Sequence, residues 1–97
     1  MDNKAQEKTY ITARIIDEEN GVKVIEKVNA VRIKSKDYRI LIMVDYAPML
    51  GALVGDVVLL TENGEVSFTN VTGYYKHQRN EFTLLIKDEF DGWYNAI

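Results

Sequence analysis

The sequence predicts an all-β protein, a single small β-sandwich of about eight short strands. Apolar and polar residues alternate with a period of two in several segments, which is the pattern of half-buried strands. Two Asn-Gly pairs, Asn20-Gly21 and Asn63-Gly64, separate such segments. The segments recur about every 8 to 12 residues, a spacing typical of a sandwich or barrel. The 97 residues are enough for one domain.

The first strand is expected at residues 10–16. Here Ile11, Ala13 and Ile15 would share one face of the strand, and the polar residues between them would share the other. This alternation indicates a strand with one side in the core.

Two hairpins are expected at the Asn-Gly pairs, because Asn and Gly both tolerate a positive φ. Asn20-Gly21 would lead into a second strand at residues 22–26. Asn63-Gly64 would join strands at residues 57–60 and 66–69.

The remaining strands are indicated by β-branched and aromatic content. They are expected at residues 28–33, 38–43, 71–75 and 81–87. A helical bundle is excluded for the main body of the chain.

Residues 45–53 break the strand pattern and hold the single proline, Pro48. Proline lacks an amide hydrogen and would interrupt a ladder of hydrogen bonds, so a central strand is not expected here. The apolar Met49, Leu50 and Leu53 are spaced for an irregular connection or one helical turn that covers an end of the core.

The composition limits the kinds of partner. The chain has no cysteine, which excludes disulfides and thiolate metal sites and fits a reducing cytoplasm. The net charge of -3 and the pI near 5.1 argue against a nucleic-acid partner. No apolar run approaches the roughly 20 residues of a membrane-spanning helix, so direct membrane insertion is not expected.

The inventory of reactive residues is sparse. The single histidine, His77, is expected to be a solvated residue of a turn, without a second group to form a site. Asp37 and Asp45 flank a strand that would hold them about 20 Å apart, so they are interpreted as turn residues. No catalytic, cofactor-binding or metal-binding residues are expected, and the protein is not expected to be an enzyme.

An exposed apolar surface is the remaining candidate for function. Leu41 and Met43 would lie on the opposite strand face from Ile40 and Ile42, so one of the two sets needs cover. That cover could come from a partner, or the strand could be a core strand covered on both faces. Apolar patches on small domains often mark contact sites.

The order of features resembles the N-terminal β-sandwich domain of the epsilon subunit of F-type ATP synthases. That family has an Asp-Gly-x-x-Gly-Ile stretch leading to Gly-His-Ala-Pro-Leu-Leu. Here Asp37-Tyr38-Arg39-Ile40-Leu41-Ile42 leads to Asp45-Tyr46-Ala47-Pro48-Met49-Leu50 with the same spacing. Further similar segments are Gly55-Asp56-Val57-Val58-Leu59, Thr72-Gly73-Tyr74 and Asn80-Glu81-Phe82-Thr83-Leu84-Leu85. The resemblance covers roughly residues 9–88.

The departures from the family pattern lie at contact positions. Leu41, Asp45 and Tyr74 stand where the family has glycine, and Tyr46 stands where it has histidine. The resemblance does not extend to the family's C-terminal helical hairpin, which inhibits ATP hydrolysis. Bulkier residues therefore stand at positions that the resemblance places at the contacts with the rotor ring and the gamma subunit.

The resemblance implies a non-catalytic coupling or adaptor role, with the gamma subunit and the rotor ring as partners and a cytoplasmic location that is at most peripheral to a membrane complex. The alternative is a diverged, free-standing binding module or homodimer of the same fold. In either form the expected partner-binding residues are Leu41, Met43, Asp45, Tyr46, Ala47, Pro48, Met49 and Leu50.

Both ends of the chain are set apart from the predicted domain at residues 9–88. Residues 1–8 are polar and are interpreted as a leader. Residues 89–97 form a short tail with Phe90, Trp93 and Tyr94, and the sequence leaves open whether Trp93 packs on the domain or binds a partner.

Overall fold

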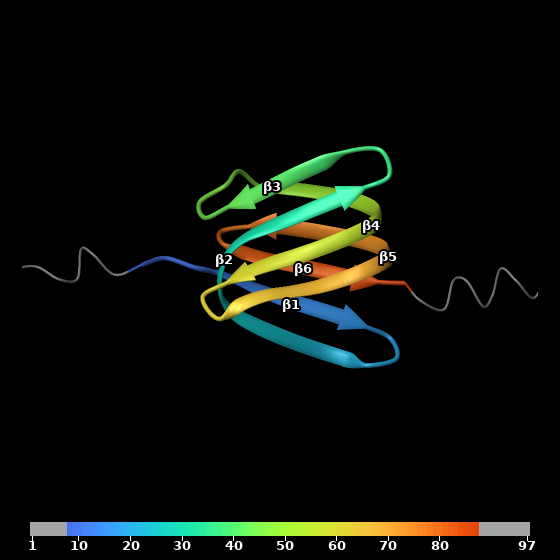
Figure 1. Cartoon of the computed structure of the whole chain (residues 1–97), viewed down its shortest axis with the longest axis horizontal. Coiled ribbons are helices and arrows are strands. Elements are labelled where there is room, and N and C mark those ends of the chain that lie inside the picture. Colours follow the sequence, from blue (N-terminus) through green and yellow to red (C-terminus); the bar gives the residue numbers. More distant parts are fainter. Residues whose placement is uncertain (1–7, 88–97) are drawn as a thin grey trace, which may run out of the picture.

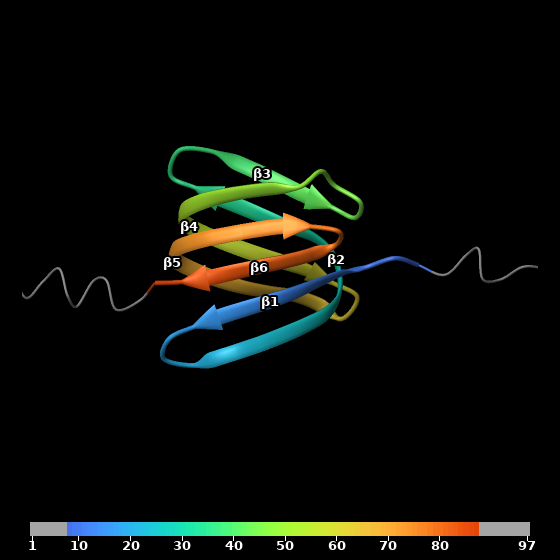
Figure 2. The same cartoon turned by 180° about the vertical axis from the view of Figure 1, so that it is seen from behind.

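A computed structural model describes residues 8–87 and contains six β-strands in this range (Figures 1 and 2). In chain order they are β1 (Ile11–Asp17), β2 (Gly21–Ser35), β3 (Arg39–Met43), β4 (Met49–Thr61), β5 (Gly64–Gln78) and β6 (Glu81–Ile86). The all-β prediction is confirmed for the described residues. The predicted tail at residues 89–97 and all but Lys8 of the predicted leader lie outside them.

The strands close into a five-stranded barrel with a sixth strand at its side, and not into two separate sheets of about eight strands. The order in the sheet is β1-β6-β5-β4-β2-β3, and β1 also pairs with β2. The ring is closed by a parallel pairing of β1 with β6, while all other pairs are antiparallel. β3 pairs only with the second half of β2.

Two long strands explain why the structure has six strands where the sequence predicted about eight. β2 unites the predicted strands at 22–26 and 28–33, and β5 unites those at 66–69 and 71–75. Each join contains a non-glycine residue with positive φ, Lys27 at 59° and Asn70 at 54°. The pairing register shifts beside both residues. Such bulges bend a strand sharply, which lets one strand serve two parts of the barrel.

The hairpins form where the sequence placed them, but the Asn-Gly turns use positive φ only at the glycines, at 82° for Gly21 and 125° for Gly64. Both central residues have positive φ only in the turn between β5 and β6. There Arg79 and Asn80 adopt 52° and 60°, as expected of a type I′ turn.

The region after Pro48 differs from the prediction. Met49 to Leu53 belong to β4 and pair with β5, and they do not form an irregular connection or a helical turn. Pro48 lies just before the strand, so its missing amide hydrogen removes no bond from the ladder. The proline therefore marks the start of a strand.

The core consists of the inward side chains of the five barrel strands together with Ile42 of β3. It includes Ile11, Ala13, Ile15, Val28, Val31, Ile33, Ile42, Leu53, Val57, Leu59, Val71, Tyr75, Phe82, Leu84 and Ile86. The predicted inward face of the first strand is thus confirmed. No helix within residues 8–87 is long and apolar enough to cross a membrane.

Candidate partner-binding surface

The side chains of β3 are divided between core and solvent. Ile42 is fully buried and Ile40 packs partly against the core. Leu41 and Met43 point outward and are 43% and 48% exposed. The described residues therefore cover only one face of β3, and the alternative of a strand covered on both faces does not hold for them.

The connection from β3 to β4, residues 44–48, is held in place by one polar contact pair. The backbone amide of Asp45 donates to Asn80 Oδ1 at 2.7 Å, and Asn80 Nδ2 donates to Asp45 Oδ1 at 2.9 Å. Asp45 has a positive φ of 63°, and the amide of Tyr46 donates to the carbonyl of Met43 at 3.1 Å. The connection is thereby tied to the β5–β6 turn.

The connection presents further apolar side chains to solvent. Tyr46 is 41% exposed, and Leu50, at the start of β4, is 76% exposed. Of the eight residues predicted to bind a partner, seven are exposed: Leu41, Met43, Asp45, Tyr46, Ala47, Pro48 and Leu50. The eighth, Met49, is partly buried against the core. The chain from Leu41 to Leu50 is called the β3–β4 surface below.

His77 lies inside the barrel, so its prediction as a solvated turn residue is wrong. It is fully buried, and its ring centroid lies 6.5 Å from that of Phe82. Neither ring nitrogen has a hydrogen-bond partner among the described residues, and burial lowers the pKa of His77. The turn is shorter than expected because β5 continues to Gln78. The period of two through Val71, Tyr75 and His77 is the signal that could have placed it inward.

A hollow of about 530 Å³ adjoins the β3–β4 surface. Pro48, Met49 and Leu50 line one side of it, and β5 supplies the other side through residues 76–78. A pocket of this size beside exposed apolar side chains could seat a side chain of a partner.

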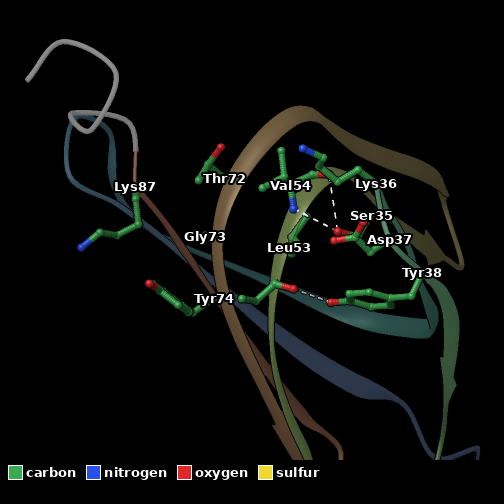
Figure 3. A pocket seen from close by; sticks show the side chains of 11 residues that line it. Ser35, Lys36, Asp37, Tyr38, Leu53, Val54, Thr72, Gly73, Tyr74 and Lys87 are labelled. Atoms are coloured by element: carbon green, nitrogen blue, oxygen red, sulfur yellow. Dashed lines mark hydrogen bonds between the residues drawn. The ribbon is translucent and has the colours of Figure 1, made fainter. Parts of the chain in front are cut away.

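A second hollow, of about 420 Å³, lies where the β2–β3 turn approaches β4, β5 and the end of β6 (Figure 3). Ser35 Oγ accepts a hydrogen bond from the amide of Val54 at 3.1 Å, and the Tyr38 hydroxyl donates to the carbonyl of Ala52 at 2.6 Å. The sequence did not indicate this hollow, because its walls come from four separate segments.

Carboxylates do not gather into a metal site within residues 8–87, where no group of three His, Asp or Glu side chains could hold an ion. Asp37 lies in the turn before β3. Asp45 lies in the turn after β3, where its carboxylate accepts a hydrogen bond from Asn80. Both aspartates thus occupy turns, as predicted from the sequence.

Comparison of the chain with protein-family models and with curated protein sequences gave no match.

Proposed function

We propose that the protein is a non-catalytic domain that binds another protein through the β3–β4 surface. The observation that carries the proposal is the exposure of four large apolar side chains along ten residues, Leu41, Met43, Tyr46 and Leu50. Exposed apolar groups of this kind cost hydration free energy in the free protein, and burying them against a partner recovers it.

Three further features of the surface support the proposal. The paired hydrogen bonds between Asp45 and Asn80 fix the backbone of the connection, which lowers the entropy lost on binding. The 530 Å³ hollow beside Leu50 offers a recess at the edge of the surface. Tyr46 and Met43 are of residue types that are enriched at protein interfaces.

The resemblance to the epsilon-subunit domain supports one specific partner. In that form of the proposal, Ala47, Pro48, Met49 and Leu50 would meet the rotor ring of an ATP synthase, a face of the sheet would meet the gamma subunit, and the protein would be cytoplasmic and peripheral to that complex. The resemblance in the order of sequence features supports this form, whereas the closed barrel of the described strands does not reproduce the two sheets of a sandwich.

The exposed bulky residues support a second form, a free-standing binding module or a homodimer. Leu41 and Tyr46, where the family has glycine and histidine, are two of the four large apolar side chains exposed on the surface. A second copy of the chain could cover them with the same apolar residues of its own surface, as an isologous dimer interface requires.

The proposal is tested with the purified full chain and two matched variants. Leu41→Glu should leave the free energy of unfolding within about 0.5 kcal/mol of that of the natural chain, because it changes an exposed side chain, but should abolish binding. Val22→Glu is the control, because Val22 is 62% exposed on β2, outside the β3–β4 surface.

Binding is measured in two ways that separate the two forms. Co-elution with a purified gamma subunit and rotor ring from the same cell supports the ATP synthase form, and concentration-dependent dimerisation in sedimentation supports the homodimer. Equal effects of Leu41→Glu and Val22→Glu on either readout would contradict the proposed surface. A chain that stays monomeric and captures no protein from the same cell would overturn the proposed function.

A further inference from the structure

The 420 Å³ hollow lies at the opposite end of the barrel from the β3–β4 surface. The β2–β3 turn and the end of β6 meet at this end, whereas the β3–β4 connection and the β5–β6 turn lie at the other (Figures 1 and 2). The hollow is therefore separate from the β3–β4 surface to which the proposed function is assigned.

Two exposed apolar side chains border the hollow. Tyr74 is 56% exposed and Val54 is 48% exposed, and both line its wall with the partly buried Tyr38 (Figure 3). They lie on adjacent strands, because Val54 of β4 pairs with Thr72, two residues before Tyr74 in β5. Within residues 8–87, Tyr74 and Val54 each leave much of their apolar surface open to solvent, so the site is suited to aromatic or aliphatic side chains.

Two lysines also line the hollow, and their backbones are fixed to its walls. The amide of Lys36 donates to the carbonyl of Val54 at 2.9 Å, and the amide of Lys87 donates to the carbonyl of Thr72 at 2.8 Å. Neither ammonium group forms an ion pair with a residue in the range 8–87. One carboxylate, Asp37, shares the lining, so the site offers two positive charges and one negative charge.

A segment with complementary chemistry follows Lys87 directly in the sequence. Residues 88–94 read Asp-Glu-Phe-Asp-Gly-Trp-Tyr, with three carboxylates interleaved with three aromatic rings. They lie outside the described residues. A chain spans at most about 3.5 Å per residue, so Phe90 can reach about 10 Å from Lys87 and Trp93 about 20 Å. Attachment to the domain gives such a segment a high effective concentration at the hollow.

We propose that the hollow between the β2–β3 turn and β5 is the binding site of this chain's own residues 88–94. The rings of Phe90 and Trp93 contact Tyr74 and Val54, and the carboxylates of the segment face Lys36 and Lys87. The segment thereby covers apolar surface that the barrel leaves exposed.

Fluorescence of the full-length protein tests this proposal, because Trp93 is the single tryptophan in the chain. Emission of Trp93 in the native protein is expected at shorter wavelength than in the same protein unfolded in denaturant, and acrylamide should quench it less. Tyr74→Ala and Lys36→Glu should each shift the emission toward that of the unfolded chain. Val24→Ala, on β2 outside both the hollow and the β3–β4 surface and 48% exposed, is the control and should leave the emission unchanged.

Circular dichroism of each variant establishes that the barrel is intact, and Lys36→Ala provides a milder change if Lys36→Glu does not fold. Native emission equal to that of the unfolded chain would overturn the proposal. It would also be overturned if the shorter wavelength persisted in both Tyr74→Ala and Lys36→Glu. Emission that depends on protein concentration would show that the segment enters the hollow of a second copy, and would overturn binding within one chain.

Discussion

The hydroxyl groups of Tyr38 and Tyr75 share a hydrogen bond of 3.0 Å, although 37 residues separate them in the sequence. Tyr38 also donates to the carbonyl of Ala52 at 2.6 Å, so the turn before β3 is connected to both β4 and β5. Burial, and then the neighbouring Tyr38, raise the pKa of Tyr75 above its ordinary value. The pair ties the chain before β3, which pairs with β2 alone, to the barrel.

Removal of either hydroxyl should destabilise the fold. We expect Tyr75→Phe to lower the free energy of unfolding by about 1 kcal/mol, the usual net worth of one hydrogen bond. Tyr38→Phe should cost more, because the carbonyl of Ala52 loses its donor as well. Urea denaturation of both single variants and the double variant measures the coupling, and strictly additive effects would contradict a direct interaction between the hydroxyls.

The stability of the protein should fall as the pH is lowered from about 6.5, the ordinary pKa of histidine. His77 is buried without a hydrogen-bond partner among the described residues, and burial lowers its pKa. Below about pH 6.5 the unfolded chain binds a proton that the folded chain does not, so unfolding becomes easier by up to about 1.4 kcal/mol per pH unit until the folded pKa is reached.

The matched variant for this prediction is His77→Met, which keeps an apolar side chain of similar bulk but cannot titrate. Denaturation midpoints measured at several pH values should show a shallower slope in His77→Met than in the natural chain. Identical slopes would show that carboxylates, and not His77, dominate the acid response.

Gly73 should not tolerate a side chain. A Cβ atom at this position would collide with the backbone carbonyl oxygen of Leu85 on β6, and a backbone atom cannot move aside as a flexible side chain can. We expect Gly73→Ala to lower the free energy of unfolding by about 1 to 3 kcal/mol, the range of overpacked cores. Ser67→Ala, at an exposed position of the same strand, is the control. A thermal or urea melt that does not separate the two variants would contradict this account.

Asn80 should be more important for the β3–β4 surface than its place in a turn suggests. Asn80 forms hydrogen bonds with both the amide and the carboxylate of Asp45. It also adopts a φ of 60°, a conformation that would cost an alanine roughly 1 to 2 kcal/mol of conformational free energy. Asn80→Ala should therefore destabilise more than Asn80→Gly, and both should weaken partner binding.

Asp45→Asn is the matched control for Asn80, because asparagine tolerates a positive φ and retains an oxygen acceptor. Its stability and binding should stay close to those of the natural chain. Unchanged partner affinity in Asn80→Gly would show that the hydrogen bonds do not position the surface.

Local pattern was sufficient to predict most strand positions and both Asn-Gly hairpins, because alternation and turn residues act over a few neighbours. It was not sufficient to join the halves of β2 and β5. Lys27 and Asn70 carry the positive φ values at the two bends, and lysine has no preference for that conformation. The strands close into a barrel, and not into a sandwich, because β1 pairs with β6. No local sequence pattern specifies this contact.

The candidate surface was more predictable than the hollows. The alternation of Ile40 and Ile42 with Leu41 and Met43 already required two apolar faces on one strand, and the structure shows which face the described residues leave open. His77 was wrongly predicted to be solvated because the predicted turn at residues 77–80 was longer than the turn in the structure, where β5 continues to Gln78. The 420 Å³ hollow depends on the approach of distant segments, so it emerges only from the closed barrel.

The parallel pairing of β1 with β6 also bears on how the chain folds. Thr12 lies opposite Glu81, so the first strand cannot complete its pairing until the last strand has been synthesised. Proteins dominated by such distant pairings fold slowly, in milliseconds to seconds, because the loop must close before the contacts form. During synthesis on the ribosome, the antiparallel pairs among β1 to β5 can form first, and closure of the ring must follow the emergence of residue 86 from the exit tunnel.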